Sequence, residues 1–387
     1  MKSVAIIPLR KGSKGIPGKN TKKLLGRSLY QWVLSEAIFS DLDEIYIFSD
    51  DPELKARVEK DYLWTDKVKF WERSKCSATD TASTEAGMLE LAESLNYDFD
   101  IFCLLQATSP FTKSEDINAV LNKLKNKEAD SVLTVVNSKR FIWSEDGESL
   151  NYKYMERPRR QDFQGLFIEN GAVYAIKKDV YLETKNRLGG NIALVEMSEE
   201  TFTEIDEPSD WTVVEQLLHN RLIQGKNLQS KTKALVLDVD GVFTGGNVLT
   251  GPDGELAKSF SLRDGMGFEI ARENQLMLIV ITSEDSPIVD RRMEKLKIEN
   301  YYKGVKDKYA LLDQICKINN IRRCEIAYVG DDINDLANML SVNWSLTPNN
   351  AVEKIKFSAD FVLQSQGGDK AIREAIEMIL KINNRLK

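Results

Sequence analysis

The chain has 387 residues, of which 42% are hydrophobic and 29% are charged, the composition of a globular protein with two or three domains. The net charge of −7 argues against bulk binding of nucleic acid. The sequence shows neither a membrane-spanning apolar run nor an N-terminal signal, so we expect a cytoplasmic protein. A single histidine, His219, excludes a zinc site with several imidazoles, so chemistry must rest on carboxylates, lysine, arginine and oxygen-bound Mg²⁺.

The chain opens with a strand and a basic, glycine-rich loop. Residues 4–8 form a short apolar run, which predicts a strand buried in a parallel sheet. The loop that follows holds three glycines and four cations, namely Arg10, Lys11, Gly12, Lys14, Gly15, Gly18 and Lys19. Because glycines let backbone N–H groups surround an anion and the cations supply charge, we predict a nucleoside triphosphate site. A solvated basic turn is the alternative, since the loop matches neither the P-loop nor the dinucleotide motif.

Strand and helix patterns alternate through the rest of the first half. They indicate helices at residues 29–39 and 117–124, and strands at residues 44–49, 101–105 and 131–136. Such alternation is typical of a doubly wound α/β domain with a mostly parallel sheet, in which ligands bind at the carboxyl ends of the strands. The basic loop occupies such an end.

Three polar stretches in this half are candidates for the same site. Gln106 follows the strand at residues 101–105, where a simple polar turn is the alternative. The three arginines within residues 157–160 suit a carboxylate, because guanidinium groups bind it in a bidentate manner. Glu204 and Asp206 project to the same side of an extended segment and could hold Mg²⁺. The alternative for these two acids is the start of a helix that Asp210 caps.

A polar segment at residues 220–233 separates the two halves of the chain, and we place the boundary there, with domains at residues 1–225 and 226–387. A new apolar strand begins at residue 234 and ends in Asp238 and Asp240. This pair suits phosphoryl transfer, since the first carboxylate can attack phosphorus and bind Mg²⁺ while the second protonates the leaving oxygen.

Further polar positions follow in the order that such chemistry needs. Thr282 ends another apolar strand with a hydroxyl group, Lys308 lies at the start of a helix, and Asp331 opens an acidic cluster that includes Asp335. Residues 242–262 contain several glycines and are predicted to form a hairpin flap, which is too small to be a full cap domain.

The motif IIPLRKGSKGIPGKN at residues 6–20 resembles the signature of the acylneuraminate cytidylyltransferases, and LLQATSP, RRQD and ENGAVY resemble further motifs of that family. The family joins CTP to a nine-carbon 2-keto-3-deoxy sugar acid and releases pyrophosphate. The resemblance implies nucleotide contacts from Arg10, Gly12, Ser13, Lys14, Lys19, Asn20, Arg73 and Gln106, with Arg10 and Lys19 acting in catalysis. It implies sugar-acid contacts from Gln106, Arg160, Gln161, Asn170 and Tyr174, and metal ligation by Glu204 and Asp206.

The second half resembles the haloacid dehalogenase phosphatases, and within them the capless tetrameric subgroup that dephosphorylates 3-deoxy sugar acids. The resemblance implies a Rossmannoid domain in which Asp238 is the nucleophile and Asp240 the acid/base. Thr282 and Lys308 would hold the phosphoryl oxygens. The implied metal ligands are Asp238, Asp240 and Asp331, with Asp335 in a supporting role, and Arg263 would contact substrate.

Together the resemblances imply a Mg²⁺-dependent bifunctional enzyme, expected to be a homotetramer without nucleic-acid or membrane partners. The 9-phosphate of a nonulosonic acid would be hydrolysed, and the free acid would then receive CMP from CTP. Alternatively, the second domain is a non-catalytic oligomerisation module, as in the animal-type relatives that residues 138–145 resemble. The preferred sugar also stays open among N-acetylneuraminate, its deaminated form KDN and bacterial di-N-acyl acids.

Overall fold

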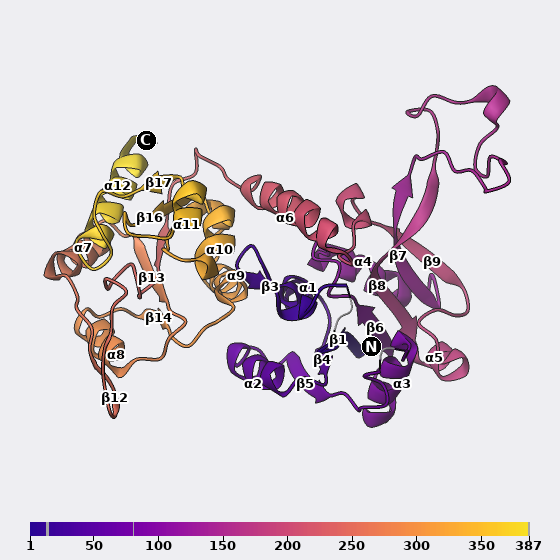
Figure 1. Ribbon diagram of the computed structural model, residues 1–387, viewed down its shortest axis with the longest axis horizontal. Coiled ribbons are helices and arrows are strands. Elements are labelled where there is room, and N and C mark those ends of the chain that lie inside the picture. Colours follow the sequence, from indigo (N-terminus) through magenta and orange to yellow (C-terminus); the bar gives the residue numbers. More distant parts are fainter. Residues whose placement is uncertain (13–14, 80, 386–387) are drawn as a thin grey trace. The chain divides into compact units, whose positions relative to one another are not determined.

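The computed structural model describes residues 1–12, 15–79 and 81–385 (Figure 1). The chain divides into two compact units, one comprising Met1–Lys22 and Ser28–Val214 and the other Lys23–Arg27 and Glu215–Lys387. The boundary at residues 225/226 stays a prediction, and the expected polar linker at 220–233 overlaps the end of helix α6 (Pro208–Ile223). Among the described residues, no helix combines the length and apolar character that a membrane crossing needs.

The first unit is built on a seven-stranded sheet in the order β5-β4-β1-β6-β8-β7-β9. Its strands are β1 (Ser3–Leu9), β4 (Glu44–Ser49), β5 (Val68–Glu72), β6 (Ile101–Leu105), β7 (Ser131–Ser138), β8 (Leu166–Lys177) and β9 (Ile192–Glu196). Strand β8 runs antiparallel to both of its neighbours, and the remaining pairs are parallel. The sheet is therefore mostly parallel, as the alternation of patterns predicts.

Helices cover this sheet, and their bounds follow the cap signals in the sequence. The helices are α1 (Leu29–Phe39), α2 (Pro52–Asp61), α3 (Thr84–Ser94), α4 (Ser114–Lys125) and α5 (Lys178–Thr184), with short 3₁₀ turns η1 (Lys19–Thr21), η2 (Tyr154–Glu156) and η3 (Glu199–Phe202). Helix α2 begins at Pro52, directly after Asp51, whose carboxylate accepts a hydrogen bond from the Glu53 N–H. This side chain satisfies one of the N–H groups that a helix start leaves without an intrahelical partner.

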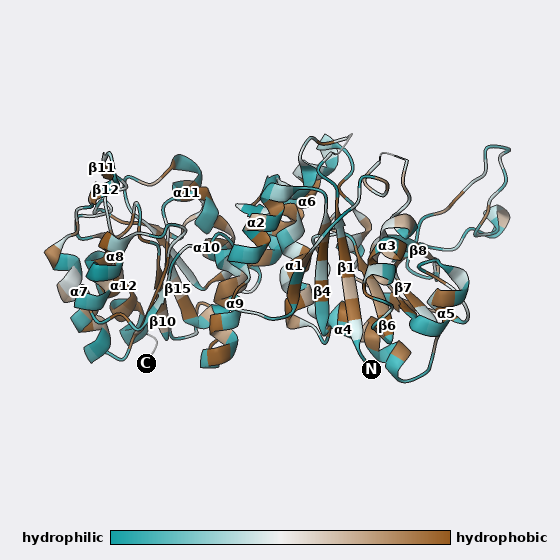
Figure 2. Ribbon diagram, turned by 90° about the horizontal axis from the view of Figure 1, so that it is seen from below, coloured by the Kyte–Doolittle hydropathy of each residue, from teal (hydrophilic) through white to brown (hydrophobic). Residues whose placement is uncertain are grey.

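Strand β1 lies in the middle of the first sheet, which explains its continuous apolar sequence. It pairs with β4 on one side and with β6 on the other, and Val4, Ile6 and Ile7 are fully buried. In Figure 2 the hydrophobic colour runs along the strands of both sheets. The loop after β1 is thereby fixed at the carboxyl edge of the sheet, where ligands bind in folds of this kind.

The second unit contains a parallel six-stranded sheet in the order β14-β13-β10-β15-β16-β17. Its strands are β10 (Ala234–Leu237), β13 (Met277–Ile281), β14 (Asn300–Tyr302), β15 (Ile326–Val329), β16 (Trp344–Thr347) and β17 (Phe361–Val362). Its helices are α7 (Leu262–Glu273), α8 (Pro287–Lys295), α9 (Lys308–Asn319), α10 (Leu336–Ser341), α11 (Glu353–Ser358) and α12 (Ala371–Arg385), with turns η4 (Arg323–Glu325) and η5 (Ile333–Asp335).

Two small hairpins accompany the second sheet. Strands β11 (Leu249–Gly251) and β12 (Gly254–Ala257) pair antiparallel and form the predicted flap. Strands β2 (Lys23–Leu24) and β3 (Arg27–Ser28) pair across a tight turn in which Leu25 and Gly26 both have positive φ angles. Most of this second hairpin belongs to the second unit, although its sequence lies near the start of the chain.

The core of the second unit joins β10 and β13 to helices α7 and α12. Phe268 on α7 is fully buried there, and its ring meets that of Phe243 edge to face with centroids 5.4 Å apart. The carboxylate of Asp264 on α7 is also fully buried and accepts a hydrogen bond of 2.9 Å from the Arg373 N–H at the start of α12. Burial raises the pKa of Asp264 to about 6.

Substitution of Phe268 tests how much this core contributes to the stability of the protein. Replacing it with alanine removes a fully buried ring, and we expect the free energy of unfolding to fall by about 3–5 kcal/mol. Phe357 on α11 is 86% exposed and provides a control of the same residue type, so F357A should change it by less than about 0.5 kcal/mol. Urea unfolding followed by circular dichroism measures both. Equal effects of the two substitutions would contradict the assigned core.

Asp264 predicts a pH dependence of stability. Its pKa is raised in the folded state, so its stabilising contribution is complete below the unfolded-state pKa and is lost as the pH rises through about 6. The unfolding free energy of the native protein minus that of D264N should therefore be about 1 kcal/mol smaller at about pH 7.5 than at about pH 5. Urea titrations at the two pH values measure this difference, and an increase with pH would show the sign to be wrong.

Candidate active sites

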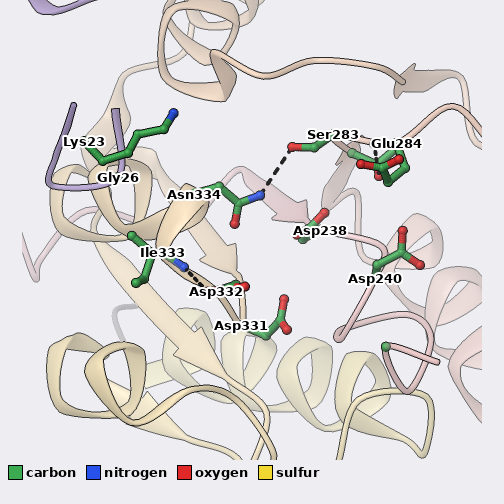
Figure 3. A pocket seen from close by; sticks show the side chains of 12 residues that line it. Lys23, Gly26, Asp238, Asp240, Ser283, Glu284, Asp331, Asp332, Ile333 and Asn334 are labelled. Atoms are coloured by element: carbon green, nitrogen blue, oxygen red, sulfur yellow. Dashed lines mark hydrogen bonds between the residues drawn. The ribbon is translucent and has the colours of Figure 1, made fainter. Parts of the chain in front are cut away.

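A cavity of about 480 Å³ opens at the carboxyl edge of the second sheet (Figure 3). It is lined by Lys23, Gly26, Asp238, Asp240, Gly246, Thr282, Ser283, Glu284, Asp331, Asp332, Ile333 and Asn334. Most of these side chains follow strands β10, β13 and β15, because parallel strands present their carboxyl ends at one edge. The volume lies within the usual range for small-molecule sites. Four predicted residues, Asp238, Asp240, Thr282 and Asp331, meet here.

A buried lysine connects two carboxylates beneath this cavity. The Nζ of Lys308 lies 2.8 Å from Oδ2 of Asp238 and 2.8 Å from Oδ1 of Asp335, and its side chain has no exposed surface. Asp335 also accepts a hydrogen bond from the Tyr328 hydroxyl at 2.7 Å. The other oxygen of Asp238 accepts the Val239 N–H at 2.7 Å, so the orientation of its carboxylate is fixed.

The charges of this cluster do not balance. Burial alone would lower the pKa of Lys308, but the charges of Asp238 and Asp335 outweigh it and raise that pKa. Burial, together with the charge of Asp335, raises the pKa of Asp238 above its ordinary value. The same two causes raise the pKa of Asp331 to about 7. One lysine therefore faces three carboxylates, and the excess of negative charge favours a bound cation.

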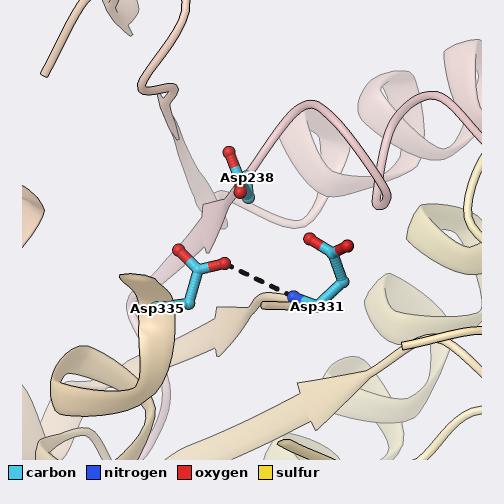
Figure 4. A group of neighbouring side chains, drawn as sticks. All are labelled: Asp238, Asp331 and Asp335. Carbon is cyan, nitrogen blue, oxygen red and sulfur yellow. Dashed lines mark hydrogen bonds between the residues drawn. The ribbon is translucent and has the colours of Figure 1, made fainter. Parts of the chain in front are cut away.

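The donor set suits a divalent metal ion. Oxygen atoms of Asp238, Asp331 and Asp335 lie within 4.8 Å of one another, and Oδ1 of Asp331 is buried without a hydrogen-bond partner. Figure 4 shows the three side chains gathered around one space. Carboxylate oxygens are the ligands that Mg²⁺ prefers. The sequence predicts Asp238 and Asp331 as ligands together with Asp240, whereas the third member of this geometric group is Asp335, which the sequence places in a supporting role.

Gly241 makes the close approach of these loops possible. Its φ angle is +92°, and a Cβ atom at this position would lie 1.9 Å from Oδ2 of Asp331. No other residue type fits without moving Asp331, because an added side chain would be both strained and in collision. The glycine after Asp240 therefore allows the β10 and β15 loops to share one cavity.

The acid/base candidate Asp240 is held by the flap. The Nζ of Lys258, just after β12, lies 2.8 Å and 3.0 Å from the two carboxylate oxygens of Asp240, and the Thr244 hydroxyl donates to Oδ1 at 3.2 Å. The Lys258 side chain is only 3% exposed and also pairs with Glu255 at 3.4 Å. The flap thus contacts Asp240, the second carboxylate of the Asp-x-Asp pair, through a largely buried ion pair with Lys258.

The remaining predicted residues of this half are divided between the cavity and the surface. Thr282 is 2% exposed, follows β13, and donates its N–H to the Tyr302 carbonyl at 2.9 Å. Beside it, the Ser283 hydroxyl accepts a hydrogen bond from the Asn334 amide at 3.3 Å. Arg263, in the first turn of α7, is exposed and is not among the residues that line the cavity, so its contact with substrate stays a prediction.

In the first unit the described part of the basic loop is tied down by its own side chains. Arg10 donates from Nε to the Gly12 carbonyl at 2.6 Å and from Nη1 to the Thr79 carbonyl at 3.4 Å. The Asn20 amide donates to the Arg10 carbonyl at 3.2 Å. Ser13 and Lys14, two of the expected nucleotide contacts, lie outside the described residues.

Lys19 brings the loop to the predicted acidic pair. Its Nζ lies 3.1 Å from Oδ1 of Asp206 and donates to the Ile205 carbonyl at 2.7 Å. Burial and the neighbouring charge of Asp206 raise the pKa of Glu204, so the two carboxylates are close enough to interact. At Gly15 an added Cβ atom would lie 2.3 Å from the Asp206 carbonyl oxygen, so the approach of loop and acids depends on this glycine. The alternative role of Asp210 as a cap coexists, because it accepts the N–H groups of Asp206 and Glu207.

Two more expected nucleotide contacts lie at strand ends. Arg73 follows β5, donates to the Ser77 hydroxyl at 3.3 Å, and has its guanidinium carbon 5.5 Å from the centre of the Phe48 ring. Burial lowers the pKa of Arg73, with the charge of Arg10 acting in the same direction. Gln106 follows β6 and donates its N–H to the Ala172 carbonyl at 3.1 Å.

The expected sugar-acid contacts fall into an inner and an outer group. Asn170 is 1% exposed; its amide oxygen accepts from the Thr134 hydroxyl at 2.7 Å and its nitrogen donates to the Thr201 hydroxyl at 3.0 Å. The buried Tyr174 donates its hydroxyl hydrogen to Glu169. Both side chains therefore make internal contacts that shape the sheet end, and a direct contact with sugar stays a prediction for each.

Arg160 and Gln161 are exposed on the long segment between β7 and β8, which extends away from the sheet of the first unit in Figure 1. An open depression here is lined by Lys139, Arg140, Phe141, Arg157, Pro158, Arg159 and Arg160. The three clustered arginines thus line one depression, and neither Lys19 nor Asp206 is among the residues that line it.

Several residues in or beside the cavity cannot be predicted from the sequence. Asn334 lines the cavity and Lys258 contacts the lining residue Asp240, but nothing in the local pattern distinguishes these two side chains. Lys23 and Gly26 lie more than two hundred positions before Asp238 in the chain, and no spacing rule connects them to it. Only the tertiary structure places them at this cavity.

In comparisons with known proteins, the two halves of the chain match two different families. The family model described as cytidylyltransferase matches residues 4–224, and that of the haloacid dehalogenase-like hydrolases matches residues 292–376. The chain is 29% identical over 395 residues to N-acylneuraminate cytidylyltransferase B of Danio rerio, covering 98% of this chain and 91% of that protein. It is 30% identical over 395 residues to N-acylneuraminate cytidylyltransferase of Oncorhynchus mykiss, covering 99% and 89%.

A second kind of relative matches the second part alone. The chain is 33% identical over 153 residues to the 3-deoxy-D-manno-octulosonate 8-phosphate phosphatase of Haemophilus influenzae, covering 40% of this chain and 85% of that protein. The chain therefore belongs to the cytidylyltransferase family and carries, in its second part, a haloacid dehalogenase-like hydrolase domain related to the 3-deoxy-D-manno-octulosonate 8-phosphate phosphatases.

Proposed function

We propose that the chain transfers CMP from CTP to a sialic acid-type nonulosonic acid, and that its second domain hydrolyses the 9-phosphate of that acid. The relatives named for N-acylneuraminate support the first activity. The observation that carries the second is the complete Asp238–Lys308–Asp335 cluster, joined by Asp331 beneath an open cavity. A domain kept only for assembly would not need this buried, charged arrangement, which is costly to maintain.

In the phosphatase reaction the Asp238 carboxylate attacks phosphorus and forms an aspartyl phosphate, while the sugar hydroxyl leaves with a proton from Asp240. Water then attacks the aspartyl phosphate with Asp240 as base and releases inorganic phosphate. Lys308, at a distance of 2.8 Å, orients the attacking carboxylate and favours its ionised form against the effects of burial and Asp335. Mg²⁺ held by Asp238, Asp331 and Asp335 would supply charge neutralisation of the phosphoryl group.

In the cytidylyl transfer the anomeric hydroxyl of the sugar acid attacks the α-phosphorus of CTP, and pyrophosphate leaves. Lys19 and Arg10 neutralise the triphosphate, and Lys19 also holds Asp206 in place at 3.1 Å. Glu204 and Asp206 would hold a second Mg²⁺ beside the phosphates. The two reactions are consecutive, because removal of the 9-phosphate yields the acid that the first domain activates.

We further propose that the enzyme works in the cytoplasm as a homotetramer. The relatives of each half are expected to assemble through their own contacts. The exposed apolar residues Leu166 and Phe167 on β8, and Ile192 and Leu194 on β9, two strands that flank β7 in the same sheet, suit contact with another subunit. Light scattering of the intact protein tests this, since a single species of monomer mass would contradict it.

The phosphatase activity is tested by substituting the nucleophile. D238N removes the attacking oxygen at nearly constant shape, so Mg²⁺-dependent phosphate release from nonulosonic acid 9-phosphates should fall by at least about 10³-fold. Asp253, an exposed residue in the flap turn, offers the matched control, and D253N should retain full activity. A phosphate-release assay over a panel of sugar-acid 9-phosphates, with and without EDTA, measures both variants.

The outcomes separate the two views of the second domain. Release that disappears in D238N establishes the activity and identifies the sugar acid. If the native protein releases no phosphate from the panel while CMP transfer proceeds, the hydrolase assignment fails and an assembly role for the second domain replaces it.

The cytidylyltransferase site is tested at Lys19. K19M removes the cation that contacts Asp206 and faces the phosphates, and kcat for CMP transfer should fall by about 10²–10³-fold. Lys55, exposed on α2, provides a matched control, and K55M should behave like the native protein. Pyrophosphate release from CTP in the presence of N-acetylneuraminate or KDN reports the rate. A K19M enzyme of native rate would exclude this lysine from catalysis.

A further inference from the structure

The short hairpin at Lys23–Arg27 is part of the second unit, although more than 180 residues separate it from the rest of that unit in the chain. It contributes Lys23 and Gly26 to the wall of the phosphatase cavity. Figure 3 shows these two residues on one side of the view and Asp240 on the other. The hairpin therefore faces the cavity opposite to the Asp-x-Asp loop.

Arg27 anchors the hairpin to the loop that carries the catalytic lysine. Its Nε and Nη2 lie 3.1 Å and 3.0 Å from the two carboxylate oxygens of Asp307, and both side chains are buried. The guanidinium carbon lies 4.4 Å from the centre of the Tyr309 ring. Asp307 caps helix α9 by accepting the Ala310 N–H, and Lys308 is the first residue of that helix. A bidentate buried pair of this kind fixes both partners.

Gly26 packs the hairpin against the second functional loop. Its φ angle is +87°, and an added Cβ atom would lie 2.0 Å from the carbonyl oxygen of Ile333. Ile333 begins the η5 turn that ends at Asp335. The hairpin therefore contacts the loops on both sides of the Lys308–Asp335 pair, and the position of Lys23 is set by these contacts rather than by a mobile loop.

The charged residues in the wall of the cavity are mostly acidic, and Lys23 is a positive charge among them. Five of the lining residues are acidic, namely Asp238, Asp240, Glu284, Asp331 and Asp332, and Lys23 is the only basic one among the described residues that line the cavity. The nearby Lys306 pairs with Glu284 at 3.1 Å. Among the described lining residues, Lys23 is therefore the one whose charge would attract a second anionic group of a substrate, remote from its phosphate.

We propose that Lys23 binds the carboxylate of the sugar-acid phosphate in the phosphatase site and so selects acids over neutral phosphate esters. The proposal rests on the proposed function, since it assigns one end of that substrate. The phosphate must reach Asp238, so the carboxylate at the opposite end of a nine-carbon chain extends away from the metal ligands. In Figure 3 the Lys23 side chain is directed toward the side of the cavity where Asn334 and Ser283 lie, between itself and Asp240.

Kinetics with a matched pair of substrates tests this assignment. The pair is the nonulosonic acid 9-phosphate that the native protein hydrolyses and its carbon-1 carboxamide, which lacks only the negative charge. The native enzyme should prefer the acid over the amide in kcat/KM by about tenfold, and K23M should lose that preference. K23R should restore most of it. The neighbouring Lys22, whose Nζ lies 4.4 Å from the centre of the Trp211 ring, supplies the matched control K22M, which should keep the native ratio.

Each outcome decides between the two proposals. A K23M enzyme with the native ratio of acid to amide overturns the role of Lys23, and so does a loss of both substrates in equal proportion, because the ratio is then unchanged. The proposed function survives either result. If the native enzyme hydrolyses no nonulosonic acid 9-phosphate of the panel, so that D238N and native protein behave alike, the proposed function itself fails, and the assignment of Lys23 fails with it.

Discussion

The second domain depends on one buried lysine between two carboxylates. Removing a partner from a buried ion pair typically costs about 3–5 kcal/mol, because the remaining charge is left without compensation. Lys308 is fully enclosed and lies 2.8 Å from both Asp238 and Asp335, so either acid alone would leave a buried charge poorly matched. Asp331 adds a third carboxylate whose pKa is raised to about 7. The same excess of negative charge that makes the cluster costly in the free protein favours a bound cation.

The first domain uses a looser form of the same arrangement. Lys19 joins the basic loop to Asp206, and Glu204 lies close enough for its pKa to respond to that neighbour. Here Asp206 is largely exposed rather than enclosed, which suits a site that must admit a triphosphate. Glycines make both arrangements possible, since Gly15 admits the Asp206 backbone and Gly241 admits the Asp331 carboxylate. In both domains, acids and a lysine thus lie together because a glycine backbone comes close to an aspartate at a position where a Cβ atom would collide with it.

The local sequence pattern predicts the site residues that directly follow strands. It does not predict the site residues whose positions depend on tertiary contacts. Asp238, Thr282 and Asp331 could be placed together because buried parallel strands end at one edge, a rule that needs only the order of elements. The resemblance to the phosphatases implies a supporting role for Asp335, and sequence spacing alone does not show which carboxylate oxygens converge. Lys258 and Lys23 gave no signal, since a lysine in a flap or a hairpin looks like any solvated lysine until packing encloses it. The seven-stranded sheet was predicted as mostly parallel, but the reversal of β8 has no local signature.

The hairpin at Lys23–Arg27 also has a consequence for biosynthesis. Domains of a nascent chain usually fold as they leave the ribosome, the N-terminal one first. The first domain can be complete once residue 214 has emerged, but the second joins five residues that precede most of the first domain to a sheet whose last strand, β17, ends at Val362. Its cavity wall therefore combines residues synthesised before most of the first domain with residues synthesised after all of it. Until Asp307 and Ile333 have been synthesised, Arg27 and Gly26 cannot make the contacts that hold the hairpin in place.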